Sequence, residues 1–316
     1  MPCVLNLTER RFSNTFLAKN LALVLVRLYP LPLLLIVSLL LLTGASVATP
    51  GQMHSNSATA ENTVDGDCDL DQIVRNSHTL TDSDLSELNP ERISLLNWNI
   101  YKGKREDWTT DFERYSHQQD ILTIQEAHLD DELEYLLEDE HRNWALNVAF
   151  DYRDKATGVM TASTVKPVSI CGQRRKEPWI RTPKTSLVSY YPLAGVYEHL
   201  LVANIHGINF TLGAKAFNRQ IESLYDTIKH HDGPLILAGD FNTWSKGRMS
   251  RVNAMAVRLE LSSVFFNENL KSKFFGHYVD HIFYRGLEKK NATTLTVATS
   301  DHNPLTVVFT LADEPI

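Results

Sequence analysis

The sequence predicts an α/β fold built on mixed β-sheets, in a domain that begins near Pro90. From that point onward, short apolar runs typical of strands alternate with amphipathic runs typical of helices. Strand runs also follow one another directly in the middle of the chain and at its end, which a purely parallel, doubly wound sheet would not produce. In addition, polar residues such as Asp240 come directly after several apolar runs, at the position where α/β proteins place ligand sites.

The elements can be justified in order along the chain. The strand runs are short, aliphatic or β-branched, and bounded by Gly, Pro or Asn. The helix expected at 216–229 is amphipathic, with Phe217 and Leu224 on one face, and the helix at Asp130 opens with an acidic turn, which favours a helix amino end. The expected helices are 108–116, 130–138, 216–229 and 245–261, and the expected strands are 93–97, 121–124, 158–165, 185–190, 199–205, 234–238, 281–284, 294–298 and 305–310.

The first fifty residues differ from the rest. Arg10, Arg11 and Lys19 precede a long apolar stretch that ends in small residues at Ala48. This order predicts a signal peptide or a membrane anchor over 1–48, and because the basic residues come first, the domain is expected outside the cytoplasm in either case. Arg27 and two prolines interrupt the apolar stretch, which leaves the alternative that the start is assigned too early and the protein is cytoplasmic. The segment 49–89 is polar and is expected to be a linker to a domain over 90–316.

The 3 cysteines, Cys3, Cys68 and Cys171, form no metal-binding cluster by their spacing. Cys68 and Cys171 could pair if the domain is exported. The favoured interpretation of Cys171 is nevertheless a small buried apolar residue at the end of a strand-like run.

Composition limits the kind of partner. The chain has 316 residues, of which 43% are hydrophobic, and a formal net charge of -7. A protein that coats long nucleic acid by electrostatics is usually basic, so the charge argues against such a surface. A phosphate substrate remains compatible with an acidic protein when a bound divalent cation supplies the local positive charge.

Six polar clusters each follow an apolar run, and their order is informative. The stretches that contain them are 96–103, 124–126, 204–206, 239–242, 279–283 and 300–304. As an ordered set they resemble the endonuclease/exonuclease/phosphatase family, and the stretches 98–102, 209–213, 240–245 and 283–287 resemble one bacterial branch of it. The resemblance covers the chain from about Ile93 to its end. It implies a deoxyribonuclease I-like four-layer α/β sandwich, with two mixed β-sheets flanked by helices.

The resemblance implies a metal site of hard oxygen ligands. Glu126, Asn99 and Asp301 would hold Mg²⁺ or Mn²⁺, which prefer oxygen ligands and keep several waters. Asn99 would place Glu126 or the cation. The ordinary alternative for Glu126 is a charge at a helix amino end.

The resemblance also implies catalytic roles for five residues. Asp240 would orient or deprotonate the attacking water, and Asn242 would hold that water or a phosphate oxygen. Asp280 would fix the ring of His302 and favour its charged form, which would stabilise the transition state. His206 would bind phosphate or protonate the leaving oxygen.

A basic stretch adds weaker candidates for contacts with substrate phosphate: Arg174, Arg175, Arg181 and Lys184. The alternative is a solvated charged loop.

The predicted function is divalent-metal-dependent hydrolysis of a phosphoester, as a phosphodiesterase or nuclease, by in-line attack of an activated water. One alternative is a phosphatase or phosphodiesterase for lipid head groups or small phosphoesters, which a membrane-directed N-terminus makes credible. Another is a catalytically inactive binding module, although every matched carboxylate and histidine is present. The expected partners are therefore a phosphoester substrate and a membrane at the N-terminus, with no protein partner predicted.

Overall fold

The structure is a computed structural model that describes residues 52–56, 62–64, 86–178, 182–211 and 213–313. The chain divides into two units, Met1–Ala45 and Ser46–Ile316, and every described residue lies in the second. The predicted signal or anchor, Cys68 and Arg181 lie outside the described residues. Among the helices that are described, none is both long and apolar enough to cross a membrane.

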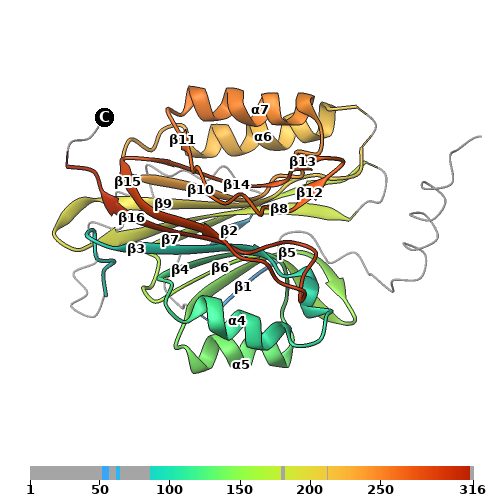
Figure 1. The fold of residues 1–316 in the computed structure, drawn as a ribbon, viewed down its shortest axis with the longest axis horizontal. Coiled ribbons are helices and arrows are strands. Elements are labelled where there is room, and N and C mark those ends of the chain that lie inside the picture. The colour runs from blue at the N-terminus through green and yellow to red at the C-terminus, as the bar shows by residue number, and fades with distance from the viewer. Residues whose placement is uncertain (1–51, 57–61, 65–85, 179–181, 212, 314–316) are drawn as a thin grey trace, which may run out of the picture. The chain divides into compact units, whose positions relative to one another are not determined.

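Two seven-stranded mixed sheets form the centre of the second unit (Figure 1). One has the order β1-β5-β6-β4-β3-β16-β15, and the other has the order β11-β14-β10-β9-β8-β7-β2. The pairs β3–β4, β9–β10 and β2–β7 are parallel, and the other pairs are antiparallel. The strands are β1 (Met53–Ser55), β2 (Asn62–Val64), β3 (Ile93–Asn99), β4 (Ile121–His128), β5 (Asn143–Tyr152), β6 (Lys155–Ser163), β7 (Ser169–Lys176), β8 (Pro183–Leu193), β9 (Val196–His206), β10 (Leu235–Asp240), β11 (Ser262–Ser263), β14 (Asp280–Arg285), β15 (Leu287–Thr294) and β16 (Leu305–Leu311), with β12 (Lys273–Phe274) and β13 (His277–Tyr278) in a separate hairpin.

The helices form two outer layers. Figure 1 shows α4 (Trp108–Ser116) and α5 (Asp131–Asp139) on one side of the paired sheets, and α6 (Lys215–Ile228) and α7 (Lys246–Arg258) on the other. A short 3-10 turn, η1 (Tyr101–Gly103), follows β3. The predicted four-layer sandwich is confirmed.

Alternation along the central strands builds three apolar layers. Leu95 of β3 packs between the two sheets, and the next residue, Leu96, packs against α4 and α5. In the other sheet, Ile236 of β10 faces the space between the sheets, whereas Leu237 packs against α6 and α7. Because both faces of these strands are buried, their sequences are continuous apolar runs rather than alternating ones.

The expected strand at 294–298 is wrong. The strand is β15, which ends at Thr294, and it lies at the edge of its sheet. An edge strand tolerates charged residues such as Lys289 and Lys290, which a buried central strand would not. The residues after Thr294 form the connection to β16, and the indole nitrogen of Trp98 donates to the carbonyl of His302 at 2.9 Å, which holds this connection over the end of β3.

Two pieces of the expected linker belong to the sheets. β1 pairs with β5, and β2 pairs with β7, each at an edge of its sheet. Whether residues 57–61 and 65–85 form a linker stays a prediction, because these residues are not described.

The structure contradicts the favoured interpretation of Cys171 as an unpaired buried residue. It lies in β7 and is buried, as expected, but it is disulfide-bonded. Its partner lies outside the described residues, so a pairing with Cys68 stays a prediction.

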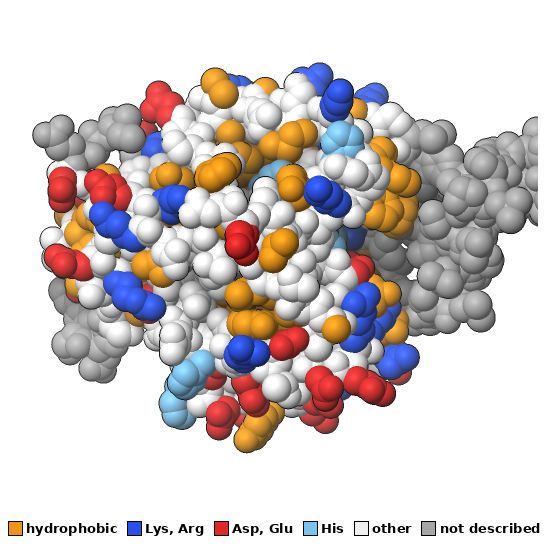
Figure 2. Space-filling view, in the orientation of Figure 1, with side chains coloured by type: hydrophobic (Ala, Val, Ile, Leu, Met, Phe, Trp, Pro, Cys, Tyr) orange, Lys and Arg blue, Asp and Glu red, His pale blue; other side chains and the backbone are white. Residues whose placement is uncertain are grey.

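The surface carries charges of both signs. Figure 2 shows Lys and Arg side chains interspersed with Asp and Glu side chains over the face that it presents. On this face of the described part the picture shows no broad basic patch.

Candidate active site

Strand register brings polar residues from both sheets together at the end of the sandwich where β3, β9 and β10 finish. Because β9 and β10 are parallel, His206 lies beside Asp240, and antiparallel β14 places Asp280 on the other side of Asp240. In the second sheet, Asn99 ends β3 beside Gln125 of β4. The side-chain nitrogen of Asn99 donates to Oδ2 of Asp240 at 3.2 Å, which joins the two edges into one site.

The backbone at this edge is unusual at three positions. Glu126 and Asn242 both have φ 52°, in the left-handed region, and Glu126 lies at an irregularity of β4 between Ile124 and Ala127. A left-handed conformation costs a non-glycine residue about 1–2 kcal/mol, and such strain is typical of functional sites. At Gly239, a Cβ would lie 2.0 Å from the carbonyl oxygen of Ile205, so the turn into Asp240 requires glycine.

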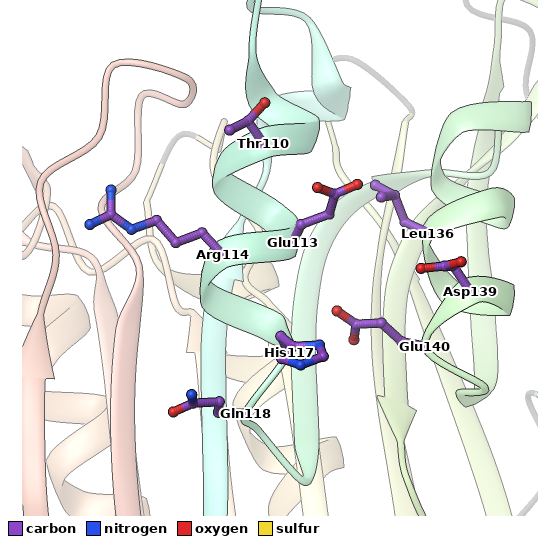
Figure 3. Close-up of a pocket in the computed structure, with 8 residues that line it drawn as sticks. All are labelled: Thr110, Glu113, Arg114, His117, Gln118, Leu136, Asp139 and Glu140. Carbon is purple, nitrogen blue, oxygen red and sulfur yellow. The ribbon is translucent and has the colours of Figure 1, made fainter.

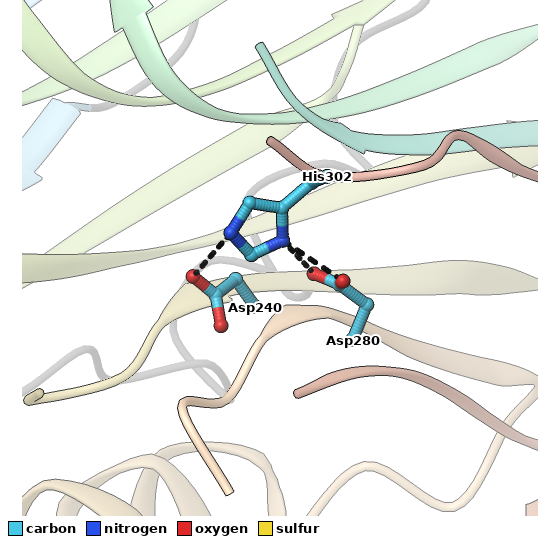
Figure 4. Close-up of side chains that lie close together, drawn as sticks. All are labelled: Asp240, Asp280 and His302. Atoms are coloured by element: carbon cyan, nitrogen blue, oxygen red, sulfur yellow. Dashed lines mark hydrogen bonds and ion pairs between the residues drawn. The ribbon is translucent and has the colours of Figure 1, made fainter. Parts of the chain in front are cut away.

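A group of three residues lies at the centre of the site (Figure 4). His302 Nδ1 lies 2.9 and 3.0 Å from the two carboxylate oxygens of Asp280, and Nε2 lies 3.8 Å from Oδ2 of Asp240. Asp240 and Asp280 are almost fully buried. Ser300 fixes the approach of the loop, because its hydroxyl donates to the carbonyl of Asn99 at 2.6 Å and accepts from the amide of His302 at 3.1 Å.

The charges of this group follow from its contacts. Burial alone lowers the pKa of His302, but the carboxylates of Asp280 and Asp240 outweigh burial and raise that pKa to about 10. The imidazole is therefore positively charged at neutral pH. Burial raises the pKa of Asp240, although the charge of His302 opposes the shift. A carboxylate with a raised pKa is a better proton acceptor than an ordinary aspartate.

His206 and Lys184 form a second polar pair. Lys184 Nζ lies 2.7 Å from His206 Nε2, and because an ammonium can only donate, Nε2 must be an unprotonated acceptor. Burial, and then the charge of Lys184, lower the pKa of His206 well below its usual value. The positive charge at this position is therefore on Lys184 and not on the imidazole.

Glu126 is paired with Lys102 of η1. The lysine ammonium donates to Oε2 of Glu126, whereas Oε1 accepts no hydrogen bond from any described residue and lies 4.0 Å from His206 Nε2. Burial raises the pKa of Glu126, but the charges of Lys102 and Lys184 outweigh burial and lower that pKa overall. Glu126 is therefore ionised and has one oxygen available.

This available oxygen fits Mg²⁺ or Mn²⁺, because these cations accept one or two protein carboxylates and take waters and phosphate oxygens as further ligands. Asp240, Asp280 and His302 also have ligand atoms within 4.8 Å of one another. In the structure both ring nitrogens of His302 face a carboxylate, Nδ1 that of Asp280 and Nε2 that of Asp240. Glu126 is the better candidate ligand.

The other two predicted metal ligands are placed differently. The amide of Asn99 contacts Asp240 and accepts from the backbone of Tyr101 at 3.1 Å, so it supports the catalytic group and not Glu126. Asp301 is exposed and makes no hydrogen bond within the described part of the chain. Their roles as ligands stay predictions.

Asn242 lies beside Asp240. Its backbone amide donates to Oδ1 of Asp240 at 2.9 Å, and its side-chain nitrogen donates to the carbonyl of Gly207 at 2.9 Å. The side-chain oxygen of Asn242 accepts no hydrogen bond from a described residue, and its role toward water stays a prediction.

The predicted phosphate contacts separate in the structure. Arg174 is buried and donates to the carbonyl of Ala149 at 2.7 Å, and Arg175 donates to the hydroxyl of Ser223 on α6 at 2.6 Å. Both therefore make contacts within the fold. Of the described candidates, Lys184 is the one at the site.

Sequence reasoning missed Lys102 and a buried network beneath the site. Gln125 Nε2 donates to Asn204 Oδ1 at 2.7 Å and to Asn97 Oδ1 at 3.0 Å, and Asn204 Nδ2 donates to the carbonyl of Met160 at 2.7 Å. The network joins the two sheets. Its only signal in the sequence is a set of amides inside apolar strand runs.

A separate pocket lies between α4 and α5 (Figure 3). Its lining includes Glu113, His117, Asp139 and Glu140, and none of the predicted site residues. It is therefore not part of the active site.

The chain matches known proteins over the region that builds this site. Residues 96–302 match the model of the Endonuclease/Exonuclease/phosphatase family. A UPF0294 protein of Vibrio campbellii (strain ATCC BAA-1116) is 40% identical over 225 residues, which cover 70% of this chain and 79% of that protein. A UPF0294 protein of Vibrio vulnificus (strain YJ016) is 40% identical over 221 residues, which cover 70% of this chain and 78% of that protein.

Solved structures share the fold at low identity. The catalytic domain of human nocturnin with bound sulfate has a TM-score of 0.57 and 19% identity, over 72% of this chain and 97% of that one. A mannosyl-6-phosphatase of Bacteroides thetaiotaomicron has a TM-score of 0.54 and 18% identity, over 69% of this chain and 100% of that one. The family model goes further than fold: this chain belongs to the endonuclease/exonuclease/phosphatase family.

Proposed function

We propose that this protein is a divalent-metal-dependent phosphodiesterase. Membership of the family supports hydrolysis of a phosphoester. The observation that carries the finer proposal is the buried group of Asp240, His302 and Asp280, where the edges of the two sheets meet. It combines a proton acceptor and a fixed positive charge, which in-line attack by water requires.

Asp240 would accept a proton from the attacking water, because burial raises its pKa. The free amide oxygen of Asn242 would accept the second hydrogen bond of that water. The His302 imidazolium, held by Asp280, would stabilise the negative charge that develops on the phosphoryl oxygens. Lys184 would bind a phosphate oxygen, in keeping with its position beside His206.

Glu126 would hold the cation through Oε1, and the bound cation would supply Lewis-acid polarisation of the phosphate. Hydrolysis of bis(p-nitrophenyl) phosphate with Mg²⁺ or Mn²⁺ tests the proposal. We expect excess EDTA to abolish turnover and added cation to restore it. Turnover that persists in excess EDTA, or no turnover with either cation, would contradict the proposal.

A phosphatase for monoesters, including lipid head groups, is the second candidate. Lys102 and Lys184 both act on Glu126, and two ammonium groups suit the dianionic phosphate of a monoester better than a monoanionic diester. The ratio of kcat/KM for p-nitrophenyl phosphate to that for bis(p-nitrophenyl) phosphate separates the two candidates. A ratio above one would favour the phosphatase.

We also propose that the domain works outside the cytoplasm, either exported or anchored. The basic residues before the apolar N-terminal stretch support this proposal, and so does the disulfide at Cys171, because disulfides persist in oxidising compartments. Alkaline phosphatase fused after Ile316 should be active, since that reporter needs an oxidising compartment. An inactive fusion in the cytoplasmic fraction would contradict export and favour a mis-assigned start.

A further inference from the structure

Lys102 lies in a turn with a rare backbone conformation. Tyr101, Lys102 and Gly103 have φ values of 53°, 60° and 59°. Glu126, at the irregularity within β4, is left-handed as well. Two unusual backbone segments thus direct one ammonium group at one carboxylate, and strain maintained at both ends of a contact indicates a function for that contact.

Stability does not account for this contact. The side chains of Lys102 and Glu126 are 12% and 19% exposed. For a pair withdrawn from water to this extent, the loss of hydration offsets most of the attraction between the charges. The fold would gain little from straining its backbone to form the pair.

The contact with Lys102 uses one oxygen of the Glu126 carboxylate, and the other oxygen is the one assigned to the cation. Lys102 is bonded to Oε2 of Glu126, and Oε1 of the same carboxylate is the candidate ligand. A divalent cation on this carboxylate would repel the ammonium strongly, because little water screens the two charges. The lysine stem is flexible and carries three donors, so the group can move to a new anion.

Resting on the function proposed above, we propose that the Lys102 ammonium is a resident counter-ion of Glu126, which the divalent cation displaces onto the substrate phosphate. Lys184 is less suited to this role, because it is bonded to His206. Lys102 is therefore a phosphate-binding residue whose release depends on the cation. The cation alone binds weakly, because it competes with a charge already in place, and phosphate binds well only after the cation has bound.

The test uses the whole protein and two ligands measured without turnover. Binding of Mn²⁺ is followed by electron paramagnetic resonance of the free ion, and binding of inorganic phosphate to the Mn²⁺-saturated protein is followed by calorimetry. The variants are Lys102→Met, Lys102→Gln and Lys102→Arg. Lys104→Met is the matched control, because Lys104 is the exposed neighbour of the turn and lies over the rings of Tyr101 and Tyr152.

Lys102→Met and Lys102→Gln should bind Mn²⁺ at least tenfold more tightly than the unaltered protein and bind phosphate at least tenfold more weakly. Lys102→Arg should stay within about threefold for both ligands, since it keeps the charge, and Lys104→Met should stay within about twofold. These opposite signs exclude a merely structural role, which would weaken both ligands.

Weaker or unchanged Mn²⁺ binding by a folded Lys102→Met or Lys102→Gln variant would overturn this inference and leave the proposed function standing. If neither variant folds, two other results together would support the inference. Lys102→Arg would bind Mn²⁺ and phosphate as the unaltered protein does, and Lys102→Ala would bind Mn²⁺ at least tenfold more tightly. Failure of Lys102→Ala to bind Mn²⁺ more tightly would overturn it. A protein that binds no Mn²⁺ in any form contradicts the inference and the proposed function together.

Discussion

The two halves of the active site are organised in different ways. The half formed by Asp240, Asp280 and His302 has its hydrogen bonds in place: both carboxylates are buried, and the imidazole is bonded and charged. The half formed by Glu126 and Lys102 pairs a carboxylate with a movable ammonium, on left-handed backbone. In the first half the ionisable groups are bonded to one another, whereas in the second half Oε1 of Glu126 accepts no hydrogen bond from a described residue and is the oxygen that we assign to the cation.

If Glu126 binds a cation as proposed, this contrast explains how one site can keep its acid–base group buried and still exchange a metal ion. Burial and a fixed loop keep His302 charged and oriented, so little reorganisation remains when substrate binds. Exchange of a cation requires access and a replaceable counter-charge, which Glu126 and Lys102 would provide under the two proposals above. Four predictions distinguish the two halves.

Asp240→Asn and His302→Ala should each lower kcat by about a hundredfold or more, the usual scale for losing a catalytic base or a charge that stabilises the transition state. Mn²⁺ binding should stay within about threefold, because neither residue is assigned to the cation. Steady-state kinetics with bis(p-nitrophenyl) phosphate and circular dichroism for folding provide the measurements. The controls are Asp226→Asn and His277→Ala, outside the site. Near-unaltered turnover in a folded variant would remove its residue from the mechanism.

Glu126→Gln should weaken Mn²⁺ binding by roughly tenfold to a hundredfold, the scale seen when a metal site loses an interaction that supports it. The bonds of His302 to Asp280 should persist, since they do not involve Glu126. Glu222→Gln, which disrupts an exposed ion pair with Arg258, is the control for loss of charge. Equal Mn²⁺ affinity in both variants would show that the cation lies elsewhere.

The dependence of kcat/KM on pH should have two limbs, both from the first half. Activity should fall at acid pH as Asp240 gains a proton, with a midpoint above that of an ordinary aspartate because burial raises its pKa. It should fall at alkaline pH near 10, where His302 loses its proton. Asp280→Asn should shift the alkaline limb to lower pH, because Asp280 is the main group that raises the pKa of His302. An alkaline limb that does not move in this variant would argue against the assigned pair.

Arg175→Ala should have the smallest effect on catalysis. Since its guanidinium is bonded to Ser223 on α6, we now expect KM for small esters and for oligonucleotides to change by less than about twofold. The loss of the bond should lower the free energy of unfolding by about 1 kcal/mol, which urea titration would detect. A rise in KM confined to long anionic substrates would instead restore the sequence-based role in phosphate binding.

The fold could be predicted because several site residues follow recognisable apolar strand runs. Asp240 and His206 follow apolar runs, and the register of parallel β9 and β10 then places them side by side. The strand at 294–298 was misplaced because β15 lies at a sheet edge, where the charged residues that usually mark a loop are tolerated.

The directions of side chains could not be predicted in the same way. Arg174 and Arg175 were candidates for phosphate contacts, with a charged loop as the alternative. They are instead consecutive residues of β7 and point to opposite faces, one toward Ala149 and the other toward α6. The pairing of Lys102 with Glu126 depends on left-handed backbone at both residues, which their types do not favour. Asn99 could be assigned to the site from its position, but its contact with Asp240 depends on how the two sheets meet.

The most direct test of this contrast is the protonation of His302 in the metal-free protein. Nitrogen NMR of ¹⁵N-histidine-labelled protein in EDTA reports whether both ring nitrogens carry protons, and His302→Asn assigns the signal. The account predicts a doubly protonated ring at pH 8, with a midpoint near 10, and little change when Mg²⁺ is added. A neutral ring at pH 8 that becomes charged only with Mg²⁺ would contradict the claim that this half is complete before the cation binds.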